Sequence, residues 1–182
     1  MPRAESGKSK RVTAARTSSE GAKAPEQLPA KPSAGHKRLK AFLGTWRTEG
    51  QQLEGPVGPA ARVTATETFE WLSGGFFLVH HFDGSVGGDD ASCIEVMGYD
   101  PARESYPVHT YYNNGITNDW EYRMNGREWL LEGEWDMAGT AVRTRCAIKF
   151  NAAGDKMTGT WEYLDDAGNW ESFWKVTSKK AK

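Results

Sequence analysis

Ten short segments, each of strand length and bounded by turn residues, constrain the fold of this chain more than any other feature. Apolar and polar residues alternate along many of them, as expected for strands that bury one face. The breaks carry glycine, and Asn114-Gly115 and Asn125-Gly126 are typical of two-residue hairpin turns. The predicted strands span residues 45–53, 61–72, 75–83, 91–99, 105–113, 116–124, 127–135, 140–150, 156–164 and 168–177.

Strands that follow one another through tight turns, without intervening helical patterns, indicate an up-and-down antiparallel sheet. Closing such a sheet removes the exposed edges that would otherwise invite aggregation. We therefore predict an all-β fold, an antiparallel up-and-down β-barrel of ten strands. A barrel of this size either fills with side chains or leaves room for one small ligand, and the sequence leaves both open.

A short helical pattern precedes the first strand. Apolar residues recur at helical spacing between His36 and Leu43, and Gly44 ends the pattern. Trp46 follows at the start of the first strand. We predict that Trp46 is a structural plug at the closed end of the barrel, where the helix meets this strand.

Two connections between strands look longer than the others. Residues 54–60 and 84–90 are both rich in glycine, and the first also contains two prolines. Long connections at the rim of a scaffold often contact ligands. We therefore predict that both are candidate lids at the barrel mouth.

Composition divides the chain into a tail and one folded domain. Eight Trp, seven Phe and six Tyr all lie beyond residue 34. The residues before that point are largely Ala, Ser, Lys, Pro and Glu, which cannot bury enough apolar surface to offset their ordering entropy. We predict a disordered basic tail at 1–35, a barrel at 36–178 and a short basic tail at 179–182.

Charge and apolar patterning limit the partners of the domain. The net charge is +4 over the first 34 residues and −5 over the remainder, so the barrel lacks a basic footprint for nucleic acid. No apolar run suits a secretory signal or a membrane span, which predicts a cytoplasmic protein without membrane insertion. Cys93 and Cys146 fall on strands that several others separate, so we expect free thiols. Homodimer formation is left open.

Several motifs resemble a known bacterial family. They are Leu43-Gly44-Thr45-Trp46, Leu72-Ser73-Gly74-Gly75-Phe76-Phe77-Leu78, Gly98-Tyr99-Asp100-Pro101 and a Gly-Glu-Trp stretch near Gly133. The Gly-X-Trp triplet also resembles the signature of the calycin superfamily, the lipocalins and fatty-acid-binding proteins. Over residues 36–177 the chain is similar to the bacterial lipocalin-like domain of unknown function 1579 family. This resemblance implies a lipocalin-like barrel with room for a small apolar ligand, and it implies no catalytic residue.

A more distant resemblance is to nitrobindin, a ten-stranded haem-binding barrel that also begins with a helix and a Gly-X-Trp-like strand. Nitrobindin binds haem iron through a histidine near its C-terminal end. The last histidine of this chain is His109, so that ligand has no counterpart here. We therefore predict neither a bound cofactor nor a metal site.

Glu67 is predicted on the apolar face of the second strand, together with Phe69. An unpaired buried carboxylate is costly, so Glu67 must be hydrogen-bonded, ion-paired or protonated. The simpler interpretation is a satisfied polar residue in a pocket, and the alternative is a catalytic base. Both interpretations place Glu67 in the cavity, and we predict that Phe69 joins it in contacting the ligand.

His80 and His81 are consecutive on the third strand, so their side chains must point to opposite faces. His80 shares its face with Leu78 and Phe82, which favours His80 as the inward residue. A histidine on an apolar face is more often a hydrogen-bonded core residue than a catalytic group. We retain His80 as a ligand contact and as the second candidate for acid–base catalysis.

Three further residues complete the predicted ligand site. His109 and Tyr111 lie two residues apart on a segment with aromatic residues on both faces. If they point inward, they join Glu67 and His80 as polar groups that orient a guest in an apolar pocket. Trp120 belongs to a set of tryptophans whose positions could line a common interior or form a common outer belt.

Three functions remain compatible with the sequence, which carries no Gly-X-Ser-X-Gly, Cys-X-X-Cys or His-X-X-X-His motif. The first is a non-enzymatic barrel that binds a small, largely apolar molecule. The second is a cofactor-independent isomerase, cyclase or hydratase in which Glu67 or His80 moves a proton. The third is a barrel with a solid core that serves in protein interaction or dimerisation.

Overall fold

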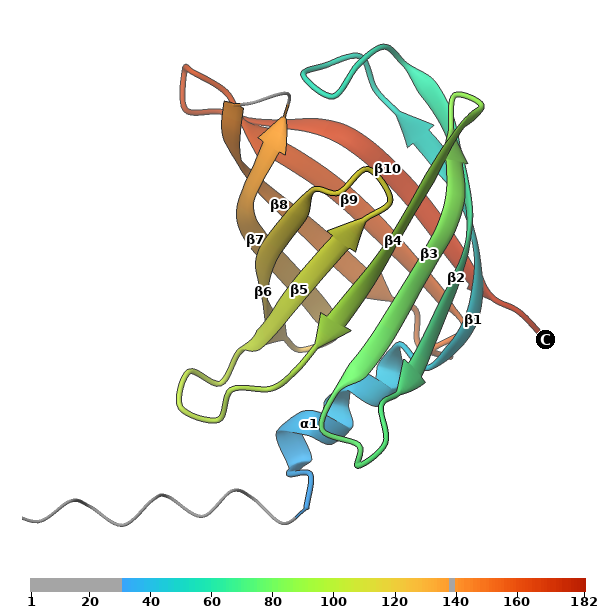
Figure 1. Cartoon of the computed structure of the whole chain (residues 1–182), viewed down its shortest axis with the longest axis vertical. Coiled ribbons are helices and arrows are strands. Elements are labelled where there is room, and N and C mark those ends of the chain that lie inside the picture. The colour runs from blue at the N-terminus through green and yellow to red at the C-terminus, as the bar shows by residue number, and fades with distance from the viewer. Residues whose placement is uncertain (1–30, 138–139) are drawn as a thin grey trace, which may run out of the picture.

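The fold is a closed barrel of ten antiparallel strands (Figure 1). It is seen in a computed structural model, which describes residues 31–137 and 140–182. Each strand pairs with its neighbours in sequence, and β1 closes the barrel by pairing with β10. This order confirms the predicted up-and-down architecture. Residues 1–30 of the predicted tail lie outside the described residues.

The strands follow the predicted segments to within three residues, and a short helix precedes them. β10 runs to Lys180, so the prediction of a C-terminal tail from residue 179 is wrong at its start. Within the described part of the chain, no helix is long and apolar enough to cross a membrane. The elements are α1 (Ala34–Arg38), the 3₁₀ turn η1 (Leu39–Ala41), β1 (Gly44–Gln52), β2 (Ala61–Trp71), β3 (Leu78–Val86), β4 (Asp89–Met97), β5 (Tyr106–Tyr112), β6 (Thr117–Asn125), β7 (Glu128–Met137), β8 (Thr140–Phe150), β9 (Lys156–Leu164) and β10 (Trp170–Lys180).

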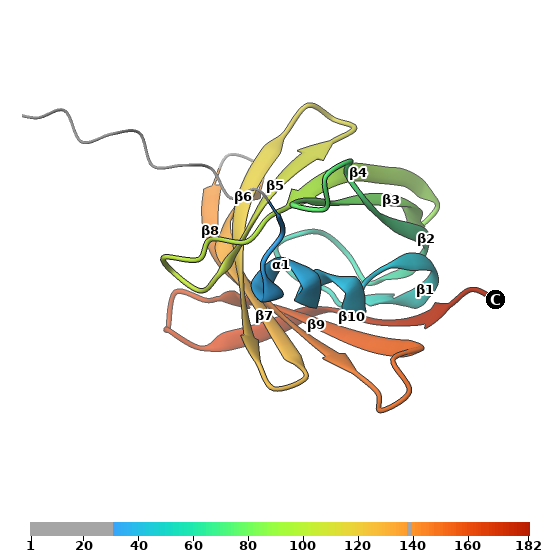
Figure 2. The ribbon, with the colours of Figure 1, turned by 90° about the horizontal axis from the view of Figure 1, so that it is seen from below.

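The helical segment closes one end of the barrel, as the view from below shows (Figure 2). Phe42, just after η1, is fully buried, and its ring centroid lies 5.1 Å from that of Trp129 and 5.5 Å from that of Phe69. Trp46 is also fully buried, and its indole nitrogen donates a hydrogen bond of 2.6 Å to the Phe42 carbonyl. Trp46 therefore lies at the closed end, as predicted.

Residues 84–90 form no lid, which corrects the sequence prediction. Gly84 lies inside β3, and only Gly87 and Gly88 separate β3 from β4, both with positive φ. Gly84 is required by close packing, because a Cβ atom there would lie 2.5 Å from the Thr64 carbonyl oxygen on β2. A glycine that permits close strand approach was thus interpreted as a loop residue.

Candidate functional site

The barrel encloses a cavity of about 670 Å³, and its lining includes residues of the connections at the end opposite α1, which we call the mouth (Figure 1). Pro56 and Val57, from the connection 54–60, line it near the mouth, together with Asn113 and Asn114 after β5. The connection 54–60 is therefore at the mouth, as predicted. The interior is not solid, so the third expected function loses its structural basis.

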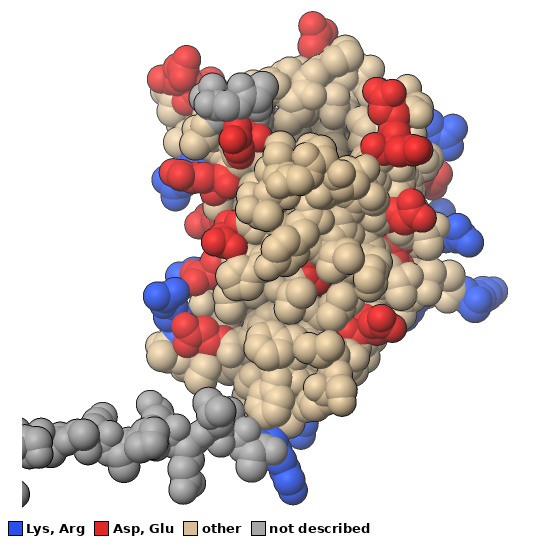
Figure 3. All heavy atoms as spheres, in the orientation of Figure 1, with Lys and Arg blue, Asp and Glu red and all other residues tan. Residues whose placement is uncertain are grey.

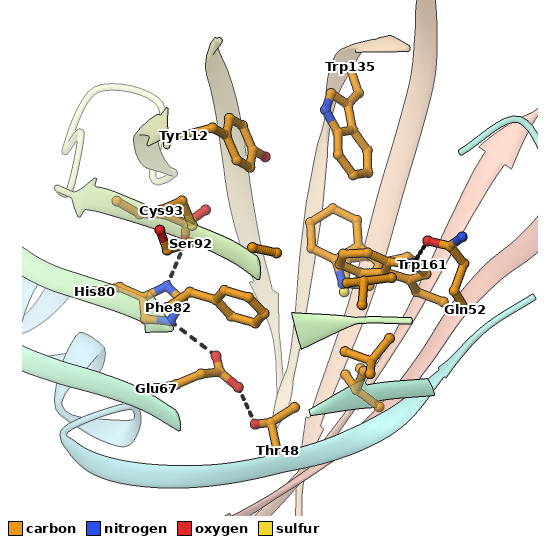
Figure 4. A pocket seen from close by; sticks show the side chains of 18 of the residues that line it. Thr48, Gln52, Glu67, His80, Phe82, Ser92, Cys93, Tyr112, Trp135 and Trp161 are labelled. Carbon is orange, nitrogen blue, oxygen red and sulfur yellow. Dashed lines mark hydrogen bonds and ion pairs between the residues drawn. The ribbon is translucent and has the colours of Figure 1, made fainter. Parts of the chain in front are cut away.

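A buried histidine between two carboxylates forms the polar centre of the cavity (Figure 4). His80 on β3 is directly opposite Glu95 on β4, and Glu67 on β2 lies diagonally across from it. His80 Nδ1 is 2.7 Å from Oε2 of Glu95, and Nε2 is 3.1 Å from Oε2 of Glu67. The first contact is an aligned hydrogen bond, whereas the second is an ion pair without that alignment. We call these three residues the carboxylate–imidazole cluster.

Hydroxyl groups form hydrogen bonds with the remaining oxygen of each carboxylate. Thr48 on β1 donates a hydrogen bond to Oε1 of Glu67, and the Ser178 hydroxyl on β10 lies 3.3 Å from the same oxygen. The Thr110 hydroxyl on β5 donates to Oε1 of Glu95 at 2.9 Å. Each carboxylate oxygen of the cluster therefore has a partner, which is what makes two buried carboxylates tolerable.

The cluster is charged near neutral pH. Burial alone would lower the pKa of His80, but hydrogen bonds and charges of Glu67 and Glu95 outweigh it and raise that pKa to about 9. Burial alone would raise the pKa of Glu67, but His80, Thr48 and Ser178 hold it below its ordinary value. Two carboxylates and one imidazolium leave one net negative charge on the cluster.

The other titratable groups around the cluster are neutral or acidic. Burial raises the pKa of Cys93 and that of Tyr112, and the charge of Glu95 raises both further. Asp90 and Asp136 lie in the cavity lining. Among residues 31–137 and 140–182, no Lys or Arg lines the cavity, so His80 supplies its only cationic side chain.

Three tryptophans, Trp135, Trp161 and Trp174, form the aromatic wall of the cavity. The ring centroid of Trp135 lies 6.3 Å from that of Trp161 and 6.1 Å from that of Trp174. The Trp174 indole donates a hydrogen bond of 2.8 Å to Gln52, which holds that ring in place. Figure 4 shows Trp135 and Trp161 across the cavity from Glu67 and His80.

Three of the six predicted ligand residues, Glu67, Phe69 and His80, line the cavity. The Phe69 ring stacks on the His80 imidazole, with centroids 3.9 Å apart and planes 2° from parallel. Trp120 is buried inside the barrel but is not among the residues that line the cavity, and its ring lies 5.7 Å from that of Trp161. It therefore packs against the aromatic wall.

His109 and Tyr111 lie on the outer face of β5, so the prediction that they contact the ligand is corrected. Tyr111 is 55% exposed, and His109 Nδ1 lies 2.6 Å from the exposed carboxylate of Asp119. Side chains alternate along a strand, and here the intervening Thr110 points inward. Figure 3 shows that the middle of this outer face carries few charged side chains.

Sequence reasoning missed Glu95, Thr48 and Ser178. Glu95 shares the inward face of β4 with Cys93 and Met97, which is the same signal that identified Glu67. Thr48 and Ser178 carry small hydroxyls that occur on either face of a strand. Only the register of β1 with β2 and β10 brings them to Glu67.

The cluster does not offer a metal site. Both ring nitrogens of His80 face carboxylates, so neither presents a free lone pair when the ring is protonated. Among the described residues, no group of three His, Cys, Asp or Glu side chains is arranged to hold a metal ion.

The raised pKa of His80 predicts a stability that falls with alkaline pH. Because its folded pKa of about 9 exceeds the ordinary 6.5, protonation stabilises the fold fully below pH 6.5, and this contribution is lost as pH rises through about 9. We expect the free energy of unfolding to fall over this range by roughly 2–3 kcal/mol. Urea denaturation at pH 6, 7.5 and 9 measures it.

The His80→Asn variant is the reference for that pH series. Groups outside the cluster titrate in both proteins, so the difference between their curves from pH 7.5 to 9, above the range in which the carboxylates of the variant take up protons, reports on His80. A wild-type curve with the same slope as the variant would contradict the assignment.

Comparisons with known proteins agree with the fold. The crystal structure of Rv2717c from M. tuberculosis superposes with a TM-score of 0.62 at 16% identity, covering 84% of this chain and 100% of that one. An S-type phycobiliprotein lyase, CPES from Guillardia theta, superposes with a TM-score of 0.52 at 12% identity, covering 80% and 92%. No curated protein matches the sequence. Residues 31–180 match the family described as "Protein of unknown function (DUF1579)", and the chain belongs to that family.

Proposed function

We propose that this barrel binds a small, largely apolar molecule in its cavity, with the polar part of the guest at the carboxylate–imidazole cluster. The observation that carries the proposal is the open space of about 670 Å³, lined mainly by apolar and aromatic side chains together with the polar groups of the cluster and of the mouth. That combination is typical of small-molecule sites. The likeness to a phycobiliprotein lyase, at 12% identity, concerns the fold alone. The proposal therefore rests on the cavity.

The acid–base alternative is less well supported by the cluster. A general base works best with a pKa near the operating pH. His80 is protonated at neutral pH because its pKa is about 9, and Glu67 is held ionised by its partners. Glu67 and His80 form an ion pair with each other, and Glu67 also contacts neighbouring hydroxyls. These contacts favour a fixed binding surface over proton transfer.

The cysteines support a reducing compartment as part of the proposal. Cys93 and Cys146 are both free, as predicted. Disulfides are rare in cytoplasmic proteins because the thiols there are kept reduced. A cytoplasmic location therefore stays part of the proposed function.

Titration with N-phenyl-1-naphthylamine, a neutral apolar dye whose emission rises in apolar surroundings, tests the proposed function. We expect saturable binding of one dye per barrel, with quenching of tryptophan emission because three tryptophans line the cavity. The Ala91→Trp variant places an indole at an inward position near the mouth and should weaken binding at least ~10-fold.

The matched control for that variant is Ile94→Trp, on the same strand. Ile94 is 44% exposed on the outer face, so an indole there leaves the cavity unchanged. Equal dye affinities of the two variants would show that the dye binds outside the cavity. Absence of saturable binding to the wild-type protein would contradict the proposed function.

A further inference from the structure

The charge of the cavity lining goes beyond what an apolar binding site requires. Its acidic side chains include Glu67, Glu95 and Asp90, and His80 is the one cation among the described lining residues. Glu67 and Glu95 lie deep in the cavity, with side chains 11% and 15% exposed. Charges there are screened by salt far less than charges on the surface.

An anionic guest would add to this negative charge. A carboxylate placed beside the carboxylate–imidazole cluster would find two like charges and only one cation, whose two ring nitrogens already face carboxylates. A guest carboxylate loses its hydration on entering the cavity, and no Lys or Arg of the described lining replaces it. The cavity therefore selects against guests with a carboxylate or phosphate head.

A cationic guest meets the opposite situation. One positive charge neutralises the net negative charge of the cluster, and carboxylate oxygens accept several hydrogen bonds each. The aromatic wall lies across the cavity from the cluster, where the apolar body of the guest can pack. Apolar parts of the guest can pack against Val63, Ile148 and Val176.

We propose that the guest is an organic cation, an amine or ammonium compound with a largely apolar body, whose charged group binds beside Glu67 and Glu95. This inference rests on the proposed function and names the ligand class for the same cavity. Binding of a neutral dye and preference for a cationic head are separate measurements, so the inference can fail while the proposed function stands.

Three probes with the same tail and different heads test the preference: decylammonium, 1-decanol and decanoate. An alkylammonium is protonated at neutral pH, as a lysine is. In calorimetric titrations at pH 7, below the micellar concentrations of the two ions and the solubility limit of 1-decanol, we expect decylammonium to bind at least ~10-fold more tightly than 1-decanol, and decanoate more weakly than both. Equal affinities, or tighter binding of decanoate, would overturn the proposal. Binding of none of the three, in a protein that binds the neutral dye, would overturn it as well.

A matched pair of variants locates the preference. Glu67→Gln removes one buried carboxylate, and Glu70→Gln makes the same change on the outer face of β2, where the side chain is 68% exposed. We expect Glu67→Gln to reduce the affinity ratio of decylammonium to 1-decanol several-fold and Glu70→Gln to leave it unchanged. If Glu67→Gln does not fold, Glu95→Gln serves in its place. If the affinity ratio of decylammonium to 1-decanol is unchanged in the folded cluster variant, the cluster does not cause the preference for a cationic head.

Discussion

Replacing His80 with Asn is expected to destabilise the barrel by about 3–5 kcal/mol at pH 7, because it leaves two buried carboxylates without their shared cation. The loss is larger than the net value of the ion pairs, since the remaining charges keep their desolvation cost. Urea denaturation followed by circular dichroism measures the effect. The matched control is His81→Asn, one residue along β3 and exposed, for which we expect a change within about 0.5 kcal/mol.

The pH dependence of the His80→Asn variant provides a second readout. Without the imidazolium, burial and mutual repulsion raise the pKa of at least one carboxylate above its unfolded value. Protonation then stabilises the fold, so the variant should gain stability as the pH falls from 7 towards 5. If His80→Asn is no more destabilising than His81→Asn, the cluster is not the electrostatic centre that we describe.

The architecture could be predicted because each strand carries its own signal. Asn114-Gly115 and Asn125-Gly126 both mark hairpin connections, with a positive φ at each glycine. The expected two-residue Asn-Gly turn is wrong in detail, because neither asparagine has a positive φ and the connections are residues 113–116 and 126–127. The error at residues 84–90 has a different origin. Gly84 is needed because Thr64 of the neighbouring strand approaches closely, and such a contact depends on the pairing of β3 with β2, which the residues around Gly84 do not reveal.

The candidate site could be predicted only where a polar residue lies on the apolar, buried face of a predicted strand. Glu67 and His80 lie on apolar faces, and that conflict identified both before their partners were known. His109 and Tyr111 were misplaced because aromatic residues occupy both faces of β5, so alternation gave no direction. The inward residue there is Thr110, whose importance comes from a hydrogen bond to Glu95 that no local pattern encodes.

Trp46→Ala is expected to cost about 3–5 kcal/mol, because it removes a fully buried indole from the closed end of the barrel. Trp46→Phe should cost less, about 1–3 kcal/mol, since the ring is kept while the Phe42 carbonyl loses its hydrogen bond. Trp170→Ala is the control. Its ring packs on the outer face under the Arg145 guanidinium at 4.2 Å, a contact worth about 1 kcal/mol.

The Trp46 variants also distinguish a structural role of Trp46 from a role in ligand binding. Trp46 is not among the residues that line the cavity, whereas Phe42, to which it donates its hydrogen bond, is. We therefore expect folded Trp46→Phe protein to bind N-phenyl-1-naphthylamine with wild-type affinity despite its lower stability. A Trp46→Ala protein as stable as Trp170→Ala would contradict the structural role. Loss of dye binding by Trp46→Phe at unchanged stability would instead show that Trp46 contributes to the site, directly or through Phe42.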